Sequence, residues 1–185
     1  MLVLIAGLPG SGKSTLAQAI ARQTEGAVID KDRLRAALFA PPDIEYSAGQ
    51  DDFCMELMLE TAQYLLTRRP TRLVLLDGRT FSRAYQRRRV IEYAQAIGQD
   101  WRVLECVCAE ATARKRIALD MALGSHPAGN RTEDLYASVR ESWEPVPEPK
   151  IVIDTEQPLE ACVARALKYL VGDLPPSPCG MRKLP

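Results

Sequence analysis

The segment LVLIAGLPGSGKST at residues 2–15 decides the fold of this chain. Its first five residues are all apolar, which is typical of a strand buried on both faces of a parallel sheet. Residues 7–14 then match the spacing G-x-x-x-x-G-K-S/T, and the Ala- and Leu-rich residues 14–23 predict a helix. A strand, a glycine-rich loop and a helix in this order are the context that a phosphate-binding loop requires.

The residue types of this loop suit the phosphates of a nucleotide. Glycines let backbone N–H groups turn inward around a phosphate, and the helix that follows adds the positive end of its dipole. Lys13 would reach the β- and γ-phosphates, while the Ser14 hydroxyl would ligate Mg²⁺. A glycine-rich turn without a ligand is the alternative. The predicted ATP-binding residues are Gly7, Leu8, Pro9, Gly10, Ser11, Gly12, Lys13, Ser14 and Thr15.

Short apolar runs alternate with helical segments along the rest of the chain. Further strands are predicted at residues 27–29, 73–76, 102–108 and 151–153. Helices are predicted at 32–39, 51–67, 82–97, 110–123, 132–143 and 158–171, with Ser82 as the cap of the third. This alternation predicts an α/β fold whose parallel sheet is covered by helices on both faces. We expect one domain over residues 1–171 and a proline-rich, loosely ordered tail over 172–185.

Composition narrows the function classes. The 24 basic and 24 acidic residues balance, so the chain lacks the basic excess of a dedicated nucleic-acid binder, although a local basic patch stays open. The five cysteines are odd in number and have no C-x-x-C spacing, which favours buried reduced thiols. The apolar start lacks a basic leader region, and we found no run long enough to span a membrane. A cytoplasmic protein without a membrane partner is expected.

The strand predicted at 73–76 runs directly into Asp77. In phosphate-loop enzymes, an aspartate at the end of such a strand holds Mg²⁺ directly or through water. The alternative is a carboxylate that only caps the turn before Gly78. Together with the phosphate loop, the position favours Asp77 and Ser14 as the metal-binding residues.

The chain lacks the guanine-reading motif N-K-x-D, and no D-x-x-G follows the third strand, so a GTPase is disfavoured. A small phosphotransferase needs a base near the acceptor hydroxyl and a group that holds the acceptor. Asp32 and Arg35 are three residues apart at the predicted carboxyl edge of the sheet, where ligands bind in open α/β folds. We expect Asp32 to be the base, Arg35 to clamp an anionic group of the acceptor and Asp30 to orient the site. An ordinary helix cap with an ion pair is the alternative.

A phosphotransferase also needs cations over the transferring phosphoryl group. The basic segment at 114–131 is the predicted lid, and Arg116 and Arg131 are its candidates for a catalytic role beside Lys13. Arg79, close to Asp77, is the candidate for acceptor contact. For Arg116 and Arg131 a solvated helix or loop surface is the competing interpretation, and the basic cluster at residues 83–89 is expected to be solvated.

On these residues the chain resembles the small P-loop kinases grouped with polynucleotide 5′-kinase, zeta toxins and chloramphenicol phosphotransferase. The shared features are G-L-P-G-S-G-K-S-T at 7–15, D-x-x-R at 32–35, L-L-D-G at 75–78 and the basic region at 114–131. The resemblance implies a three-layer sandwich with a five-stranded parallel sheet of order 2-3-1-4-5 and a small lid. It also implies a base at Asp32, a phosphate contact at Arg35 and an adenine pocket near residues 154–155. The turn at Asp77-Gly78-Arg79-Thr80 departs from the family pattern.

The prediction is therefore an ATP- and Mg²⁺-dependent kinase that phosphorylates a hydroxyl group. The acceptor stays open between a nucleic-acid 5′-hydroxyl and a small phosphorylated or anionic metabolite. Two alternatives remain: a nucleotide-dependent regulatory or binding module with little turnover, and a toxin-like kinase of a nucleotide sugar. The sequence does not determine the oligomeric state.

Overall fold

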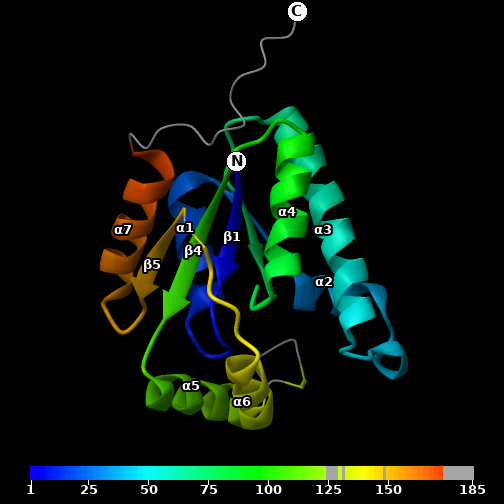
Figure 1. Cartoon of the computed structure of the whole chain (residues 1–185), viewed down its shortest axis with the longest axis vertical. Helices are drawn as coiled ribbons and strands as arrows, with labels where there is room; N and C mark the ends of the chain where they lie inside the picture. The colour runs from blue at the N-terminus through cyan, green and yellow to red at the C-terminus, as the bar shows by residue number, and fades with distance from the viewer. Residues whose placement is uncertain (124–128, 131, 148, 173–185) are drawn as a thin grey trace, which may run out of the picture.

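A computed structural model of the chain describes residues 1–123, 129–130, 132–147 and 149–172 (Figure 1). Five parallel strands form one sheet of order β2-β3-β1-β4-β5, which confirms the predicted strand order. The strands are β1 (Leu2–Ala6), β2 (Ala27–Asp30), β3 (Val74–Asp77), β4 (Trp101–Val107) and β5 (Lys150–Asp154). Because the strands are parallel, their carboxyl ends meet at one edge of the sheet.

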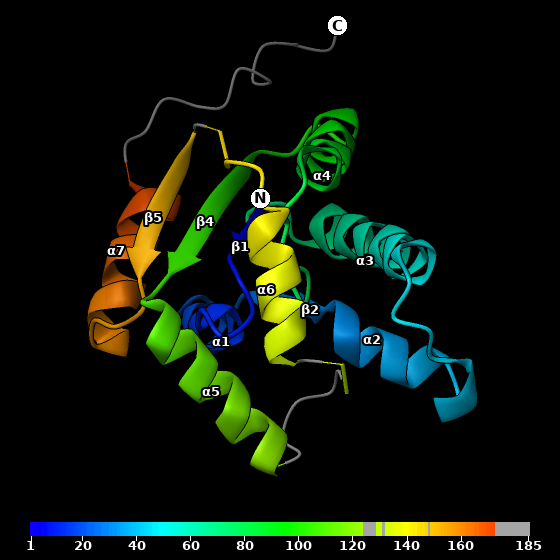
Figure 2. The ribbon, with the colours of Figure 1, turned by 60° about the horizontal axis from the view of Figure 1, so that its bottom comes forward.

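Helices cover both faces of this sheet, as the alternating pattern predicts. The helices are α1 (Lys13–Thr24), α2 (Lys31–Leu38), α3 (Ala48–Arg68), α4 (Ala84–Ala96), α5 (Glu110–Leu123), α6 (Glu133–Glu141) and α7 (Leu159–Val171), with a 3₁₀ turn at Pro41–Asp43. α1 and α7 pack on one face, and α3 and α4 pack on the other. Near the carboxyl ends of the strands, α5 and α6 lie on one side and α2 on the other (Figure 2).

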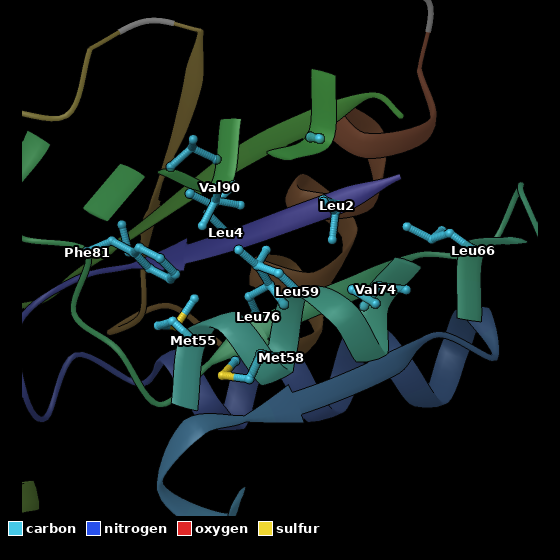
Figure 3. Close-up of a cluster of buried hydrophobic side chains, with 14 of the residues drawn as sticks. Leu2, Leu4, Met55, Met58, Leu59, Leu66, Val74, Leu76, Phe81 and Val90 are labelled. Carbon is cyan, nitrogen blue, oxygen red and sulfur yellow. The ribbon is translucent and has the colours of Figure 1, made fainter. Parts of the chain in front are cut away.

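Strand β1 lies at the centre of the core. All five of its side chains are fully buried, and they alternate between two apolar clusters. Leu2 and Leu4 pack with α3 residues such as Met58 (Figure 3), whereas Val3 and Ile5 pack against α1 and α7. The uninterrupted apolar run is therefore explained by burial on both faces of the sheet.

Two local expectations are wrong. Helix α4 begins at Ala84 with Arg83 at its N-cap position, so Ser82 is not the cap. The first N–H group of the helix, that of Ala84, instead donates to Glu144 Oε2 at 2.5 Å. A carboxylate sixty residues away along the chain thus serves the end of this helix. The helix expected from residue 51 begins earlier, because α3 starts at Ala48 and Ser47 caps it.

Arg87 is not part of a solvated basic surface. It is 4% exposed and donates hydrogen bonds to three carbonyl oxygens, those of Phe81 at 2.6 Å, Glu144 at 3.3 Å and Pro145 at 3.0 Å. Burial lowers the pKa of its guanidinium, with Glu144 opposing the shift. Arg87 thus ties the loop after β3 to the segment that follows α6.

Several predicted features lie outside the described residues. These are Arg131, most of the loop between α5 and α6, and tail residues 173–185. Among the helices of the described part, none combines the length and apolar character needed to cross a membrane.

Replacing Arg87 by alanine should destabilise the fold. The change removes donors from three carbonyl groups, so we expect the free energy of unfolding to fall by about 2 kcal/mol or more. Urea denaturation measures the change. Arg88→Ala on the exposed side of the same helix is the matched control and should stay within about 0.5 kcal/mol of the parent. Equal effects of the two substitutions would contradict the anchoring role of Arg87.

Candidate active site

The phosphate loop is closely packed at three glycines. Gly7, Gly10 and Gly12 have φ angles of 147°, 78° and 80°, which L-residues rarely adopt. A Cβ atom on Gly10 would lie 2.5 Å from the Ala113 carbonyl oxygen, and one on Gly7 would lie 2.5 Å from that of Cys106. The glycines are thus required by the loop conformation and by the approach of β4 and α5.

The side chain of Lys13 is held by backbone carbonyl groups of the phosphate loop. Its ammonium donates to the carbonyl oxygens of Gly7 and Leu8, at 2.8 Å in both cases. Lys13 begins α1, so the charge lies where the N-terminus of that helix meets the loop. This arrangement combines a cation with the positive end of a helix dipole, which suits an anionic ligand.

Arg116 of α5 reaches the same loop. Its guanidinium donates to the Gly10 carbonyl at 3.2 Å, to Thr155 Oγ1 at 3.0 Å and to the Thr155 carbonyl at 2.9 Å. Thr155 follows β5, and its hydroxyl also contacts the Ser11 carbonyl at 3.0 Å. Arg116 therefore bridges the phosphate loop and the segment after β5, where the family resemblance implies an adenine pocket.

Asp77 ends β3 as a fully buried carboxylate. Neither of its oxygens finds a hydrogen-bond partner within the described part of the chain. Asp77 and Ser14 line the same cavity, so a hard cation such as Mg²⁺ fits these two oxygen donors. No group of three or more acidic, His or Cys side chains in the described residues could hold a metal alone. A bound Mg²⁺ would therefore need oxygens from a nucleotide as well.

Asp30 caps helix α2. Its Oδ1 atom accepts from the N–H groups of Asp32 at 2.9 Å and Arg33 at 3.2 Å. Burial raises the pKa of this carboxyl group, and the neighbouring Asp77 raises it further. Asp30 does not line the cavity in the described residues, so its observed role is to fix the start of the helix that carries Asp32.

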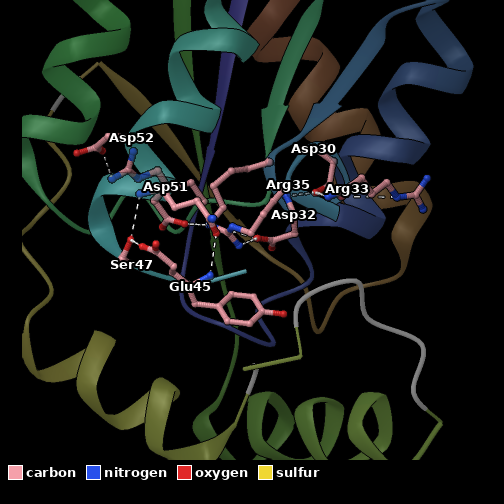
Figure 4. A network of polar contacts seen from close by, with 12 residues as sticks. Asp30, Asp32, Arg33, Arg35, Glu45, Ser47, Asp51 and Asp52 are labelled. Carbon is pink, nitrogen blue, oxygen red and sulfur yellow. Dashed lines mark hydrogen bonds and ion pairs between the residues drawn. The ribbon is translucent and has the colours of Figure 1, made fainter. Parts of the chain in front are cut away.

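Asp32 belongs to a cluster of four charges in which Asp32, Lys31 and Arg35 are buried and Asp51 is partly exposed (Figure 4). Its Oδ1 atom lies 2.9 Å from Arg35 Nη1 and 3.2 Å from Lys31 Nζ. Asp51 of α3 contacts both cations through one oxygen, at 2.7 Å from Lys31 Nζ. Arg35 is 2% exposed and also lies over the Tyr46 ring, 5.1 Å from its centroid. Both terminal nitrogens of Arg35 are therefore already paired, which differs from the expected clamp for an acceptor anion.

Arg79, which follows β3, is also paired with a carboxylate. Its Nη2 atom donates to Asp52 Oδ1 at 2.6 Å and to the Tyr85 hydroxyl at 3.2 Å. Arg79 is 5% exposed and lines the cavity with a carboxylate beside it.

One cavity of about 500 Å³ joins these groups. The predicted site residues that line it are Pro9, Gly10, Gly12, Lys13, Ser14, Thr15, Asp32, Arg35, Asp77, Arg79 and Arg116. Sequence reasoning missed other lining residues, which include Lys31, Tyr46, Asp51, Gln86, Asp120 and Asn130. Gly7, Leu8 and Ser11 instead line a second cavity of about 240 Å³. Of these residues, Lys31 could have been predicted to line the site, because it is next to Asp32 in the sequence. Asp51 and Gln86 could not, because they come from helices α3 and α4.

The family model for the AAA domain matches residues 2–120, more than half of the chain. This chain belongs to that AAA-domain family. The match spans the phosphate loop, the Asp32 cluster, Asp77 and Arg116. No curated protein matches the sequence significantly.

Solved structures share the fold of this AAA-domain protein. A Chloroflexus aurantiacus protein assigned to the kinases is 20% identical over 91% of this chain and 97% of that chain, with a TM-score of 0.72. The Mycobacterium tuberculosis APS kinase CysC, solved with AMPPNP and APS, is 18% identical over 91% and 96% of the two chains, with a TM-score of 0.70. A gluconokinase from Sinorhizobium meliloti is 19% identical over 91% and 94%, with a TM-score of 0.61. The fold is thus that of small P-loop kinases.

Gly78 should not tolerate a side chain. Its φ angle is 81°, and a Cβ atom there would lie 2.7 Å from the Lys31 backbone nitrogen and 2.8 Å from Asp30 Oδ1. We expect Gly78→Ala to lower the free energy of unfolding by about 1–3 kcal/mol, measured in urea. Gly49→Ala is the control, because Gly49 lies in helix α3. A Cβ atom there would lie 3.9 Å from Ser47 Oγ, its nearest neighbour outside the helix backbone. This substitution should be neutral or stabilise by up to about 1 kcal/mol. A neutral Gly78→Ala would show that the turn after β3 does not constrain α2.

Proposed function

We propose that this protein is an ATP- and Mg²⁺-dependent kinase that transfers the γ-phosphoryl group to a hydroxyl group of an acceptor. The observation that carries the proposal is the single cavity lined by both the phosphate loop and Asp32. A donor site and a candidate base in one cavity meet the main requirement of phosphoryl transfer, which is positioning. A purely nucleotide-binding module would not need Asp32 in that space.

The donor half consists of the phosphate loop, Lys13, Ser14, Asp77 and Arg116. Backbone N–H groups and Lys13 would hold the β- and γ-phosphates, and Arg116 would add positive charge at the rim of the loop. Ser14 and Asp77 would hold Mg²⁺, which neutralises charge on the phosphates when it is bound. Arg131, predicted to assist from the lid, lies outside the described residues.

The acceptor half consists of Asp32 and the charges around it. Lys31 and Arg35 both contact Oδ1 of Asp32, so we assign Oδ2 as the proton acceptor. The acceptor oxygen forms a bond to the γ-phosphorus as the bond from that phosphorus to the bridging oxygen breaks. The proton of the hydroxyl passes to Asp32, and ADP leaves with the electron pair of the broken bond.

Replacing the proposed base tests this assignment. Asp32→Asn should lower the transfer rate by roughly 10²–10⁴-fold, because the amide cannot accept the proton. ATP affinity should stay within about twofold, since Asp32 is placed on the acceptor side. The measurement is transfer of labelled γ-phosphate, with nucleotide binding followed by calorimetry. Asp43→Asn, in the 3₁₀ turn on the same side of the fold, is the control.

Wild-type product formation by Asp32→Asn would refute the base assignment, and loss of ATP binding would show that Asp32 is structural. The acceptor panel should include 5′-hydroxyl oligonucleotides, nucleosides, nucleotide sugars and antibiotic alcohols. Tight ATP binding without any labelled product would favour the nucleotide-dependent binding module instead.

Asp77→Asn should weaken nucleotide binding only when Mg²⁺ is present. The amide removes the charged oxygen donor, so we expect ATP affinity to fall about tenfold with Mg²⁺ and to change little in EDTA. Calorimetric titration with and without Mg²⁺ measures the difference. Asp134→Asn, at an exposed position of α6, is the control. The same loss of affinity in EDTA would mean that Asp77 does not act through the metal.

A further inference from the structure

The acceptor half of the cavity balances its charges internally. Its cations are Lys31, Arg35 and Arg79, and the carboxylates that contact them are Asp32, Asp51 and Asp52. Every one of these cations has a carboxylate partner within the described residues. These pairs lie in the cavity that the proposed function uses, so the inference rests on that function.

Lys31 and Arg35 are each held by two carboxylates. Lys31 and Arg35 are buried, and each contacts both Asp32 and Asp51. An anionic acceptor that drew Arg35 away would leave Lys31 to neutralise both Asp32 and Asp51, and would add its own negative charge beside them. The pairing therefore disfavours recognition of a phosphate or carboxylate by Arg35.

The third cation is neutralised by a more accessible group. Arg79 is buried, but the side chain of its partner Asp52 is 50% exposed. The guanidinium also donates to the Tyr85 hydroxyl and lies 5.8 Å from the centroid of that ring. Asp52 is therefore the carboxylate that neutralises Arg79, and its ion pair is separate from those of the Asp32 cluster.

The remaining lining suits hydroxyl groups. Gln86 and Asn130, which have amide side chains, are among the residues that line the cavity, and the aromatic side chain of Tyr46 lies beside the charge cluster. Carboxylates accept hydrogen bonds from hydroxyls, amides both donate and accept, and an aromatic ring packs against the C–H face of a sugar-like molecule. A negatively charged acceptor would instead face Asp32 and Asp51, and each of the three cations described in this half already has a carboxylate beside it.

We infer that the acceptor is a neutral polyhydroxylated molecule, without a phosphate or carboxylate group. We infer further that Asp52 determines this preference by neutralising Arg79. This replaces the anionic acceptor expected from the position of Arg35 in the sequence.

Matched pairs of alcohols test the inference. The kcat/KM for transfer from labelled ATP is measured with glucose and gluconate, ribose and ribose 5-phosphate, and adenosine and 5′-AMP. We expect the wild-type protein to prefer the neutral member of each productive pair by roughly tenfold or more. A preference for the anionic members would overturn the inference while leaving the proposed kinase function intact.

Changing Asp52 tests its part in the preference. Asp52→Asn leaves Arg79 unpaired, so the ratio of neutral to anionic kcat/KM should fall by roughly tenfold. Asp52→Asn combined with Arg79→Met should restore the wild-type ratio, because the freed cation is then absent. Glu56→Gln is the control: Glu56 lies one turn further along α3 and pairs with Arg89 on the surface. Thermal unfolding and ATP affinity verify that each variant is folded.

The results distinguish a failure of the role given to Asp52 from a failure of the proposed kinase function. An unchanged ratio in folded Asp52→Asn, or the same change in Glu56→Gln, would overturn the role of Asp52. Transfer to no alcohol of either kind, together with ATP hydrolysis unaffected by Asp32→Asn, would refute the proposed function and with it the acceptor assignment.

Discussion

The parallel pairing of β1 with β3 on one side and β4 on the other is the constraint on which the rest of the structure depends. It buries β1 completely, which is why residues 2–6 are apolar on both faces. It also brings the carboxyl ends of β1, β2 and β3 to one edge. The phosphate loop, the Asp32 cluster and Asp77 follow those three strand ends, so the sheet itself assembles the donor and acceptor halves of one cavity.

Close backbone contacts then fix these groups relative to one another. Gly78 lies against the first residues of α2, and Asp30 caps that helix, so the turn after β3 constrains where the helix that carries Asp32 begins. Arg116 connects the phosphate loop to the segment after β5. The site is therefore built from short connections between rigid elements, which suits a reaction that depends on positioning.

Charge is arranged differently in the two halves. On the donor side, Lys13 and Arg116 contact backbone carbonyls, and Asp77 has no partner in the described residues, so this half suits an anionic nucleotide together with a cation. On the acceptor side, Lys31, Arg35 and Arg79 are each paired with a carboxylate. The same cavity can thus attract a highly charged donor and favour an uncharged acceptor.

The sequence by itself determined the α/β class, the phosphate loop, the buried strand and the position of Asp77, because each depends on local spacing or on an apolar run. The strand order agreed with the family resemblance. Only the tertiary structure decided the partners of Arg35, Arg79 and Arg87, because Asp51, Asp52 and Glu144 are brought to them by other helices and loops. Residue type and spacing show that an arginine is present, but whether it is free to bind a ligand depends on contacts between segments far apart in the chain.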